Sequence, residues 1–252
     1  MRKAIIQSRD LNAFSPGLEP ATLCRQTRPM IVSHAHRFIF LRTEKTAGSS
    51  LMKALRDMAT EKDLVADMSR PPWAKFSPIH HGALKRKIPD LFGLHVHATA
   101  AQARRVLGPH VFDSYFKFAV ERNPWDRQLS LYMHRCWKTG RAPNFDRDIQ
   151  SLIYRSTEHV RLNNFDVYAI GGDVVADRIL RYERFEEDLE ALWQDLGIEA
   201  PELGREREYN KEPRPHYSTF YTPKSRDLIG RWYAKEIAAL GYSFESGSAV
   251  AS

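Results

Sequence analysis

Short apolar runs alternate along this chain with segments in which apolar residues recur at helical spacing. Residues 37–60 contain one such run and one such segment, which predicts a strand, a polar loop and a helix. A second run covers residues 111–120 and precedes a long helix that begins at Pro124. A third covers residues 178–182 and precedes a helix over 185–196. This alternation predicts an α/β protein with a central, mainly parallel sheet flanked by helices on both faces.

Other helices are predicted from their ends and their periodicity. Thr99 and Gln102 form a capping box that opens a helix, and Gly108 ends it. Residues 223–240 are predicted to form a final helix, and residues 141–172 to be mainly helical. The apolar face of this last segment consists of Ile149, Leu152 and Ile153.

Length and composition favour one domain. The chain has 252 residues, of which 42% are hydrophobic, and this is enough to bury a sizeable core. We therefore predict a single domain over residues 1–252, with an irregular lead-in at 1–35 and a flexible tail at 245–252. Residues 68–90 are rich in proline, histidine and aromatic residues without a clear period. This composition predicts a loop or an insertion on the substrate side.

The cysteines and the apolar segments indicate the cellular compartment of the protein. Cys24 and Cys136 are the only cysteines, so the sequence contains no disulfide framework and favours a reducing compartment. No uninterrupted apolar run approaches the ~20 residues that span a bilayer. The short apolar piece at residues 4–6 is followed at once by polar residues, which does not fit a secretory signal. We predict a cytoplasmic protein without stable membrane insertion.

The loop after the first apolar run has the composition of an anion-binding site. The start of a helix presents unpaired backbone N–H groups and the positive end of the peptide dipoles, which favour a phosphate or sulfate. Lys45 adds a positive charge, and Gly48 allows the backbone to approach a ligand closely. Ser49 and Ser50 add hydroxyl donors. The alternative interpretation is a purely structural corner between a strand and a helix.

The order of residues in this loop differs from that of a nucleoside-triphosphate P-loop. That motif places lysine after its last glycine, and a serine or threonine for magnesium follows the lysine. Here Lys45 precedes Gly48, the only glycine of the loop. A P-loop kinase of a small molecule is therefore a disfavoured alternative. Histidines and cysteines show no zinc spacing, and no metal is predicted.

A second anion site is predicted where the run at 111–120 ends. Asn123 is a natural N-cap, and Pro124 is a natural first helical residue. Arg122 would stand at the end of the strand and Ser130 about two turns into the helix, where a guanidinium and a hydroxyl can converge on a phosphate. In the alternative interpretation Arg122 pairs with a nearby carboxylate and Ser130 is a packing residue.

Together the two segments resemble those of sulfotransferases that use 3′-phosphoadenosine-5′-phosphosulfate (PAPS). Residues 37–55 resemble the 5′-phosphosulfate loop of these enzymes, although Ala47 stands where many relatives have glycine. Residues 116–132 resemble their 3′-phosphate motif, V-x-R-N-P-x-x-R-x-x-S-x-Y. The matching residues are Val120, Arg122, Asn123, Pro124, Arg127, Ser130 and Tyr132. Residues 181–189 and 209–244 resemble further segments of the carbohydrate sulfotransferase branch.

This resemblance implies a P-loop-like three-layer fold and transfer of the sulfuryl group from PAPS to a hydroxyl, in this branch that of a carbohydrate. It implies that Lys45 stabilises the charge that builds on the bridging oxygen of the donor. Golgi relatives carry a membrane anchor, so this chain resembles a bacterial or otherwise soluble cytoplasmic member of the family. The residues that it implies for PAPS binding are Lys45, Thr46, Ala47, Gly48, Ser49, Ser50, Arg122, Ser130 and, in a basic loop before the last helix, Lys211.

Histidine is the default base for an acceptor hydroxyl, because its pKa lies near neutrality. His95 and His97 lie two residues apart, on the same side of an extended segment, and directly precede the capped helix. The segment resembles the H-x-H-V stretch of heparan 2-O-sulfotransferases, although here a valine separates the two histidines. This resemblance implies His97 as the catalytic base, with His95 beside it. His80 and His81 are the next candidates.

Two glutamates are alternative bases. Glu44 is expected to pair with a cation, because it adjoins a lysine in the chain. Glu183 follows a predicted strand and is expected to orient Arg122 or Arg181. Both are therefore predicted to hold cations in place, and His97 stays the preferred base.

The net charge of +7 and the pI of about 9.4 suit a doubly anionic nucleotide and an acidic saccharide, but they suit nucleic acid equally. A third alternative is therefore a non-catalytic basic module that binds nucleic acid or an acidic polysaccharide. It does not explain two separate anion motifs at strand ends, so no nucleic-acid partner is predicted. The aromatic residues that could pack against sugar faces are Trp73, Phe76, Trp125 and Trp137.

Overall fold

The computed structural model describes residues 30–46, 48–60, 63–65, 97–156, 162–201 and 215–245. The segment at 68–90 and nearly all of the predicted lead-in and tail lie outside these described residues, as do Ala47, His95 and Lys211. Within the described part, no helix combines the length and the apolar character needed to cross a bilayer.

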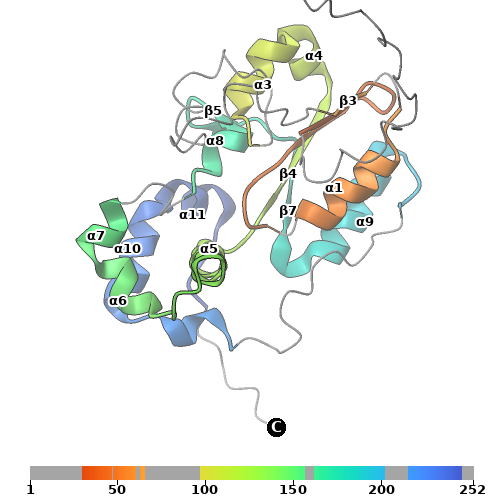
Figure 1. The fold of residues 1–252 in the computed structure, drawn as a ribbon. Helices are drawn as coiled ribbons and strands as arrows, with labels where there is room; N and C mark the ends of the chain where they lie inside the picture. The colour runs from red at the N-terminus through yellow and green to blue at the C-terminus, as the bar shows by residue number, and fades with distance from the viewer. Residues whose placement is uncertain are drawn as a thin grey trace, which may run out of the picture.

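A five-stranded sheet forms the centre of the described structure (Figure 1). Its strands stand in the order β3-β1-β2-β4-β7. Their bounds are Ile31–Ser33 (β1), Phe38–Leu41 (β2), Leu64–Val65 (β3), Phe116–Glu121 (β4) and Arg178–Arg181 (β7). β4 pairs in parallel with β2 and β7, while β1 pairs antiparallel with β2 and β3, so β1 alone runs against the other strands. The predicted mainly parallel sheet is confirmed.

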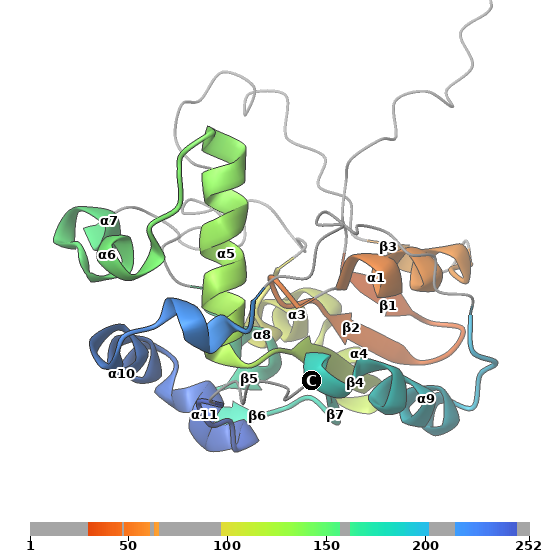
Figure 2. The same cartoon turned by 90° about the horizontal axis from the view of Figure 1, so that it is seen from below.

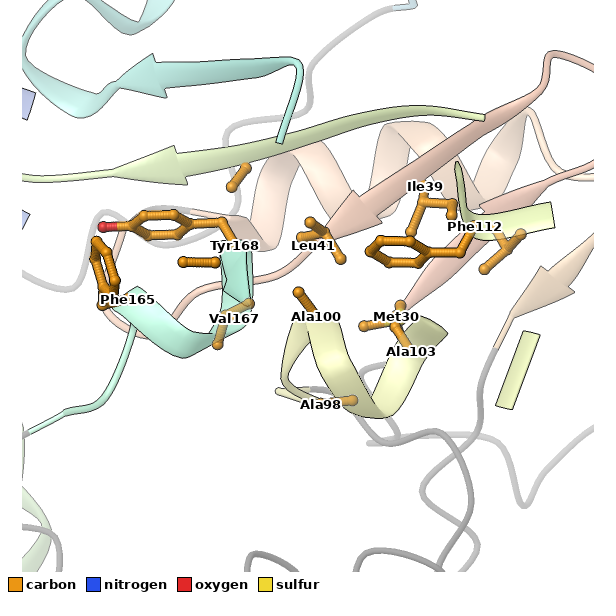
Figure 3. Packing of buried hydrophobic residues seen from close by; sticks show 13 residues of the cluster. Met30, Ile39, Leu41, Ala98, Ala100, Ala103, Phe112, Phe165, Val167 and Tyr168 are labelled. Atoms are coloured by element: carbon orange, nitrogen blue, oxygen red, sulfur yellow. The ribbon is translucent and has the colours of Figure 1, made fainter. Parts of the chain in front are cut away.

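Alternate residues along β2 face two separate apolar clusters. Ile39 and Leu41 pack with α3, α4 and α8 on one face of the sheet (Figure 3), whereas Phe38 and Phe40 pack with α1 and α9 on the other. The bounds of these helices are Gly48–Asp57 (α1), Ala100–Leu107 (α3), Pro109–Ser114 (α4), Phe165–Tyr168 (α8) and Phe185–Leu196 (α9). Each large apolar side chain buried in this way contributes ~1.5–3 kcal/mol. The predicted three-layer arrangement, with the sheet between two helical layers, is confirmed.

Helix α5 (Pro124–Thr139) leaves the sheet after β4 and stands beside α6, α7 and α10 (Figure 2). A third apolar cluster packs α5 against α6, α7 and α10. The bounds of the remaining helices are Phe145–Gln150 (α6), Leu152–Ser156 (α7), Pro223–Trp232 (α10) and Ala234–Leu240 (α11). Short 3-10 turns cover Tyr182–Arg184 (η4) and Tyr217–Phe220 (η5), and a two-stranded ribbon joins Ala169–Ile170 (β5) to Asp173–Val174 (β6).

Several predicted helix ends are confirmed. The Thr99 side chain accepts a hydrogen bond from Gln102 N at 3.2 Å, and the Gln102 side chain accepts one from Thr99 N at 2.9 Å, so the capping box forms. Asn123 caps α5 by accepting from Trp125 N at 3.1 Å, with Pro124 as the first helical residue. Helix α9 has the predicted bounds.

The prediction of a strand over 111–120 is wrong in its first half. Residues 109–114 form helix α4, and the strand starts only at Phe116. Pro109 is well suited to the first position of that helix, where the absent N–H is not needed. Gly108 turns the chain between α3 and α4 with φ 80°, a conformation that glycine adopts without steric cost.

Two predictions about the later helices also require correction. Residues 141–172 contain short helices and a strand, and Leu152 and Ile153 are 75% and 81% exposed, so they form no buried face with Ile149. The final helix is divided into α10 and α11 at Tyr233. The ring of Tyr233 is buried, and its hydroxyl donates to Gln128 Oε1 at 2.5 Å and accepts from Leu162 N at 3.0 Å.

Candidate active site

The loop between β2 and α1, residues 42–47, is called the first loop. Its backbone is held from two sides. The Thr43 hydroxyl donates to the carbonyl of Val120 on β4 and lies 2.8 Å from the hydroxyl of Thr46. On the other side, the amide of Asn164 accepts from Glu44 N at 3.0 Å and donates to Glu44 O at 3.1 Å. These bonds fix the residues on both sides of Lys45.

Lys45 itself has φ 64°, a left-handed conformation that is uncommon for a residue with a β-carbon. Burial lowers the pKa of its ammonium, and the nearby positive charge of Arg122 lowers it further, while Glu44 raises it. Burial and then Lys45 likewise lower the pKa of His134 on α5. Three cationic or titratable groups from separate elements therefore face a common region.

The two residues after β4, Arg122 and Asn123, are called the second loop. The Arg122 Nε donates to Asp126 Oδ2 at 2.7 Å, and its guanidinium carbon lies 4.1 Å from the centre of the Tyr182 ring. Asn123 N donates to Glu183 Oε1 at 2.6 Å. Glu183 thus holds the backbone of the second loop and does not orient Arg122 or Arg181 as expected.

His97 lies directly against the first loop. Its Nδ1 is 3.0 Å from the carbonyl oxygen of Arg42. A carbonyl can only accept, so Nδ1 carries the proton of this bond, and in the neutral ring Nε2 is the unprotonated nitrogen. A histidine in this tautomer can take up a proton at Nε2.

The side chain of Arg42 is 6% exposed. Within the described residues, its Nε and Nη1 have no hydrogen-bond partner. Burial lowers the pKa of this guanidinium to about 10, while Glu44 raises it and Arg56 lowers it further. A buried guanidinium with unsatisfied donors stabilises any anion that reaches it.

Other residues singled out from the sequence take different positions. Gly48, Ser49 and Ser50 form the first turn of α1, so backbone N–H groups are available beside the first loop. The Thr46 side chain is buried, and its hydroxyl contacts Thr43. Ser130 is partly buried on α5. Ala47, His95 and Lys211 fall outside the described residues.

Sequence reasoning missed Arg42, His134 and Asn164. Arg42 carried a usable signal, because a charged residue directly after a buried strand is costly without a ligand or a partner. His134 stands four residues after Ser130, on the same face of one helix. Asn164 carried no local signal, since its partner Glu44 lies 120 positions away.

Three comparisons relate this chain to known proteins. The sequence model of the sulfotransferase family matches residues 28–243. An uncharacterized protein of Archaeoglobus fulgidus is 31% identical over 104 residues, a match that covers 38% of this chain and 78% of that protein. The crystal structure of a sulfotransferase from Alicyclobacillus acidocaldarius is 17% identical with a TM-score of 0.42, over 82% of this chain and 96% of that one.

The described residues contain no group of three or more histidines, cysteines, aspartates or glutamates placed to hold a metal ion.

Proposed function

Because the chain belongs to the sulfotransferase family and therefore transfers a sulfuryl group, we propose that its donor is PAPS and that its acceptor is a hydroxyl of a carbohydrate. One observation carries the donor assignment. Arg122 lowers the pKa of Lys45, so the cations that follow two neighbouring parallel strands lie close to one another. A nucleotide with anionic groups at its 5′ and 3′ ends suits such a pair of cations.

The residues of the site fit this donor. Among the described residues, Arg42 has two buried donors without a hydrogen-bond partner, and Lys45 makes no ion pair. The first turn of α1, a helix of ten residues, adds backbone N–H groups and the positive end of its dipole. Each of these groups is stabilised by an anion.

The donor supplies a sulfuryl group already bonded to a phosphate leaving group. In the proposal, the Lys45 ammonium neutralises the charge that develops on the bridging oxygen, while the start of α1 holds the 5′ end in line. Arg122 and Ser130 hold the 3′-phosphate. Catalysis then depends on alignment and charge stabilisation.

His97 is proposed as the general base. The bond from Nδ1 to the Arg42 carbonyl holds the ring in the tautomer whose unprotonated nitrogen is Nε2, the atom that takes the proton in this proposal. As the acceptor oxygen bonds to sulfur, its hydroxyl proton moves to Nε2 and the sulfur–oxygen bond to the leaving phosphate breaks. His95, outside the described residues, stays a prediction.

An aromatic pair on α5 supports a carbohydrate acceptor. The rings of His134 and Trp137 stack with centroids 5.9 Å apart and planes 26° apart, and Trp137 is 67% exposed. After the larger effect of burial, the charge of Lys45 also lowers the pKa of His134, and we therefore propose that the pair borders the transfer site. A broad exposed indole suits the apolar face of a sugar ring. By contrast Trp125 is buried in the third cluster, which corrects its candidacy for sugar contact.

The test is transfer of radioactive sulfate from PAPS to a panel of glycans and simple alcohols. Calorimetry with adenosine 3′,5′-bisphosphate, without magnesium, measures donor-site binding separately. We expect both signals, with a glycan as the preferred acceptor. Stabilisation only by ATP with magnesium would favour the kinase alternative. Tight DNA binding without any response to the bisphosphate would favour the polyanion-binding module.

The base is tested with His97→Gln. Loss of a general base lowers turnover by ~10²–10⁴-fold, and the bisphosphate should bind the variant as it binds the wild type. His110→Gln, on the exposed surface of α4, is the matched control and should leave turnover unchanged. Turnover of His97→Gln within a few-fold of wild type would remove His97 from this role.

A further inference from the structure

Asn164 carries a buried side chain that serves a distant loop. It stands at the N-cap position of α8, where an asparagine usually accepts a bond from its own helix, but no such side-chain bond forms. The residue is 1% exposed, and its amide pairs with both backbone groups of Glu44 in the first loop. Only one orientation of the amide satisfies both bonds, so the geometry is specific.

The same amide reaches the strand that leads to the second loop. Asn164 Nδ2 lies 3.4 Å from Glu121 Oε1 at the end of β4. That oxygen also accepts from the backbone N of Arg122 at 2.9 Å. A chain of hydrogen bonds therefore runs from Glu44 through Asn164 and Glu121 to the residue proposed to hold the 3′-phosphate.

A buried ion pair fixes the middle of this chain. Arg127 is fully buried on α5, and its Nη1 donates to Glu121 Oε1 at 2.5 Å. Its Nη2 donates to Glu236 Oε1 on α11 at 3.1 Å. Because burial of Glu121 is compensated by Arg127, its carboxylate can serve as a fixed acceptor for both loops.

These hydrogen bonds matter because they act on the residue next to Lys45. Its left-handed backbone is unfavourable for a lysine and persists only where the surrounding bonds impose it. Asn164 binds both polar backbone atoms of the preceding residue. The direction of the Lys45 side chain therefore depends on these two hydrogen bonds with Asn164, which are called the Asn164 clasp.

We propose that Asn164 is a positioning residue for sulfuryl transfer, which holds the first loop so that Lys45 keeps its place and which joins that loop to the second loop through Glu121. The role rests on the proposed function, because it assigns a catalytic purpose to the Lys45 ammonium. Because Asn164 is 1% exposed, the proposal assigns it no contact with donor or acceptor. It acts through the backbone of Glu44.

The first test compares turnover of Asn164→Ala in two backgrounds. We expect kcat to fall between about tenfold and a hundredfold, because misplacement of a group by about 1 Å has effects of that size. In the Lys45→Ala background the same change should alter kcat by less than about twofold, because residues that act as a unit are not additive. A merely structural defect would lower both backgrounds alike, and that result would overturn the proposal.

The matched control is Asn163→Ala. Asn163 is exposed, and its Nδ2 donates to Asp166 Oδ2 at 2.5 Å. The Asn163→Ala substitution therefore removes the same type of side chain one position away, without affecting the first loop. We expect wild-type turnover. Asn164→Asp keeps the acceptor for Glu44 N but places a carboxylate beside the Glu44 carbonyl and Glu121, so it should lower kcat more than Asn164→Ala does.

Hydrogen–deuterium exchange of the ligand-free protein tests the clasp independently of activity. In Asn164→Ala the amides of residues 44–46 should exchange faster, while those of β7 keep their protection. Unchanged exchange in the first loop overturns the inference, as does loss of protection throughout the chain. If the wild type neither binds the bisphosphate nor transfers sulfate, the proposed function fails and the catalytic role fails with it. If the wild type is active and the two substitutions are additive, only the inference fails.

Discussion

The first and second loops follow neighbouring parallel strands, yet they hold their cations in opposite ways. In the first loop, bonds to the backbone and to Thr43 fix the chain, and the Lys45 ammonium makes no ion pair among the described residues. In the second loop, the charge itself is held, by Asp126 and by the ring of Tyr182.

This difference separates two tasks. A cation without a carboxylate partner, in a partly buried site, interacts strongly with charge that develops during a reaction. A cation already paired with a carboxylate gains less from a new anion, because it must share or exchange its partner. The first loop is therefore suited to rate acceleration, and the second to binding and orientation.

The largest effect is expected for Lys45→Ala. Removal of a preorganised group that stabilises developing charge costs about 3–4 kcal/mol, so kcat should fall at least a hundredfold. Binding of adenosine 3′,5′-bisphosphate should weaken by less than tenfold. Sulfate transfer and calorimetry measure the two quantities. Lys53→Ala, on the exposed face of α1, is the control. Equal losses in kcat and in affinity would contradict the assignment of rate acceleration to the first loop and of binding to the second.

Arg122→Ala should show the reverse pattern. A hydrogen bond to a charged group contributes about 1.5–3 kcal/mol, so the bisphosphate should bind roughly tenfold to a hundredfold more weakly. At saturating PAPS, kcat should stay within a few-fold of wild type. Asp126→Asn removes the carboxylate that competes with the phosphate for Arg122. We therefore expect this variant to bind the bisphosphate more tightly than the wild type does. Weaker binding by Asp126→Asn would show that the ion pair is needed to orient Arg122.

The smallest effect concerns pH. Lys45 acts as a cation, so activity is present below its pKa and is lost as the pH rises through it. Because burial and Arg122 lower that pKa below the ordinary 10.5, kcat/KM for PAPS should decline at a lower pH than an ordinary lysine would give. Arg122→Ala removes one of these causes, so the decline should move to higher pH. Lys45→Arg, which stays charged, should abolish it. An alkaline limb unmoved by both substitutions would assign it to another group.

Much of the local structure could be predicted from the sequence, because its causes lie within a few residues. Thr99 and Gln102 cap α3 through bonds across three positions, and Asn123 with Pro124 starts α5 in the same way. The alternation of residues in β2 similarly predicts a strand buried on both faces. At residues 109–114 the apolar run favoured a strand, whereas Pro109 begins a helix there and Phe112 is buried on it.

The candidate site divides in the same manner. Lys45 and Arg122 stand out in the sequence because each follows a buried strand and precedes a helix. That they lie close together depends on the parallel pairing of β2 with β4, which the alternation of elements already favours.

Only the tertiary structure decided which groups hold these cations in place. Glu183 binds a backbone amide, Asn164 clasps a loop 120 positions away, and Arg127 joins two buried carboxylates. The exposure of Leu152 and Ile153 was decided in the same way. Helix ends and the alternation of strand residues follow mainly from neighbours in the chain, whereas the partner and the burial of a side chain depend on segments brought together by packing.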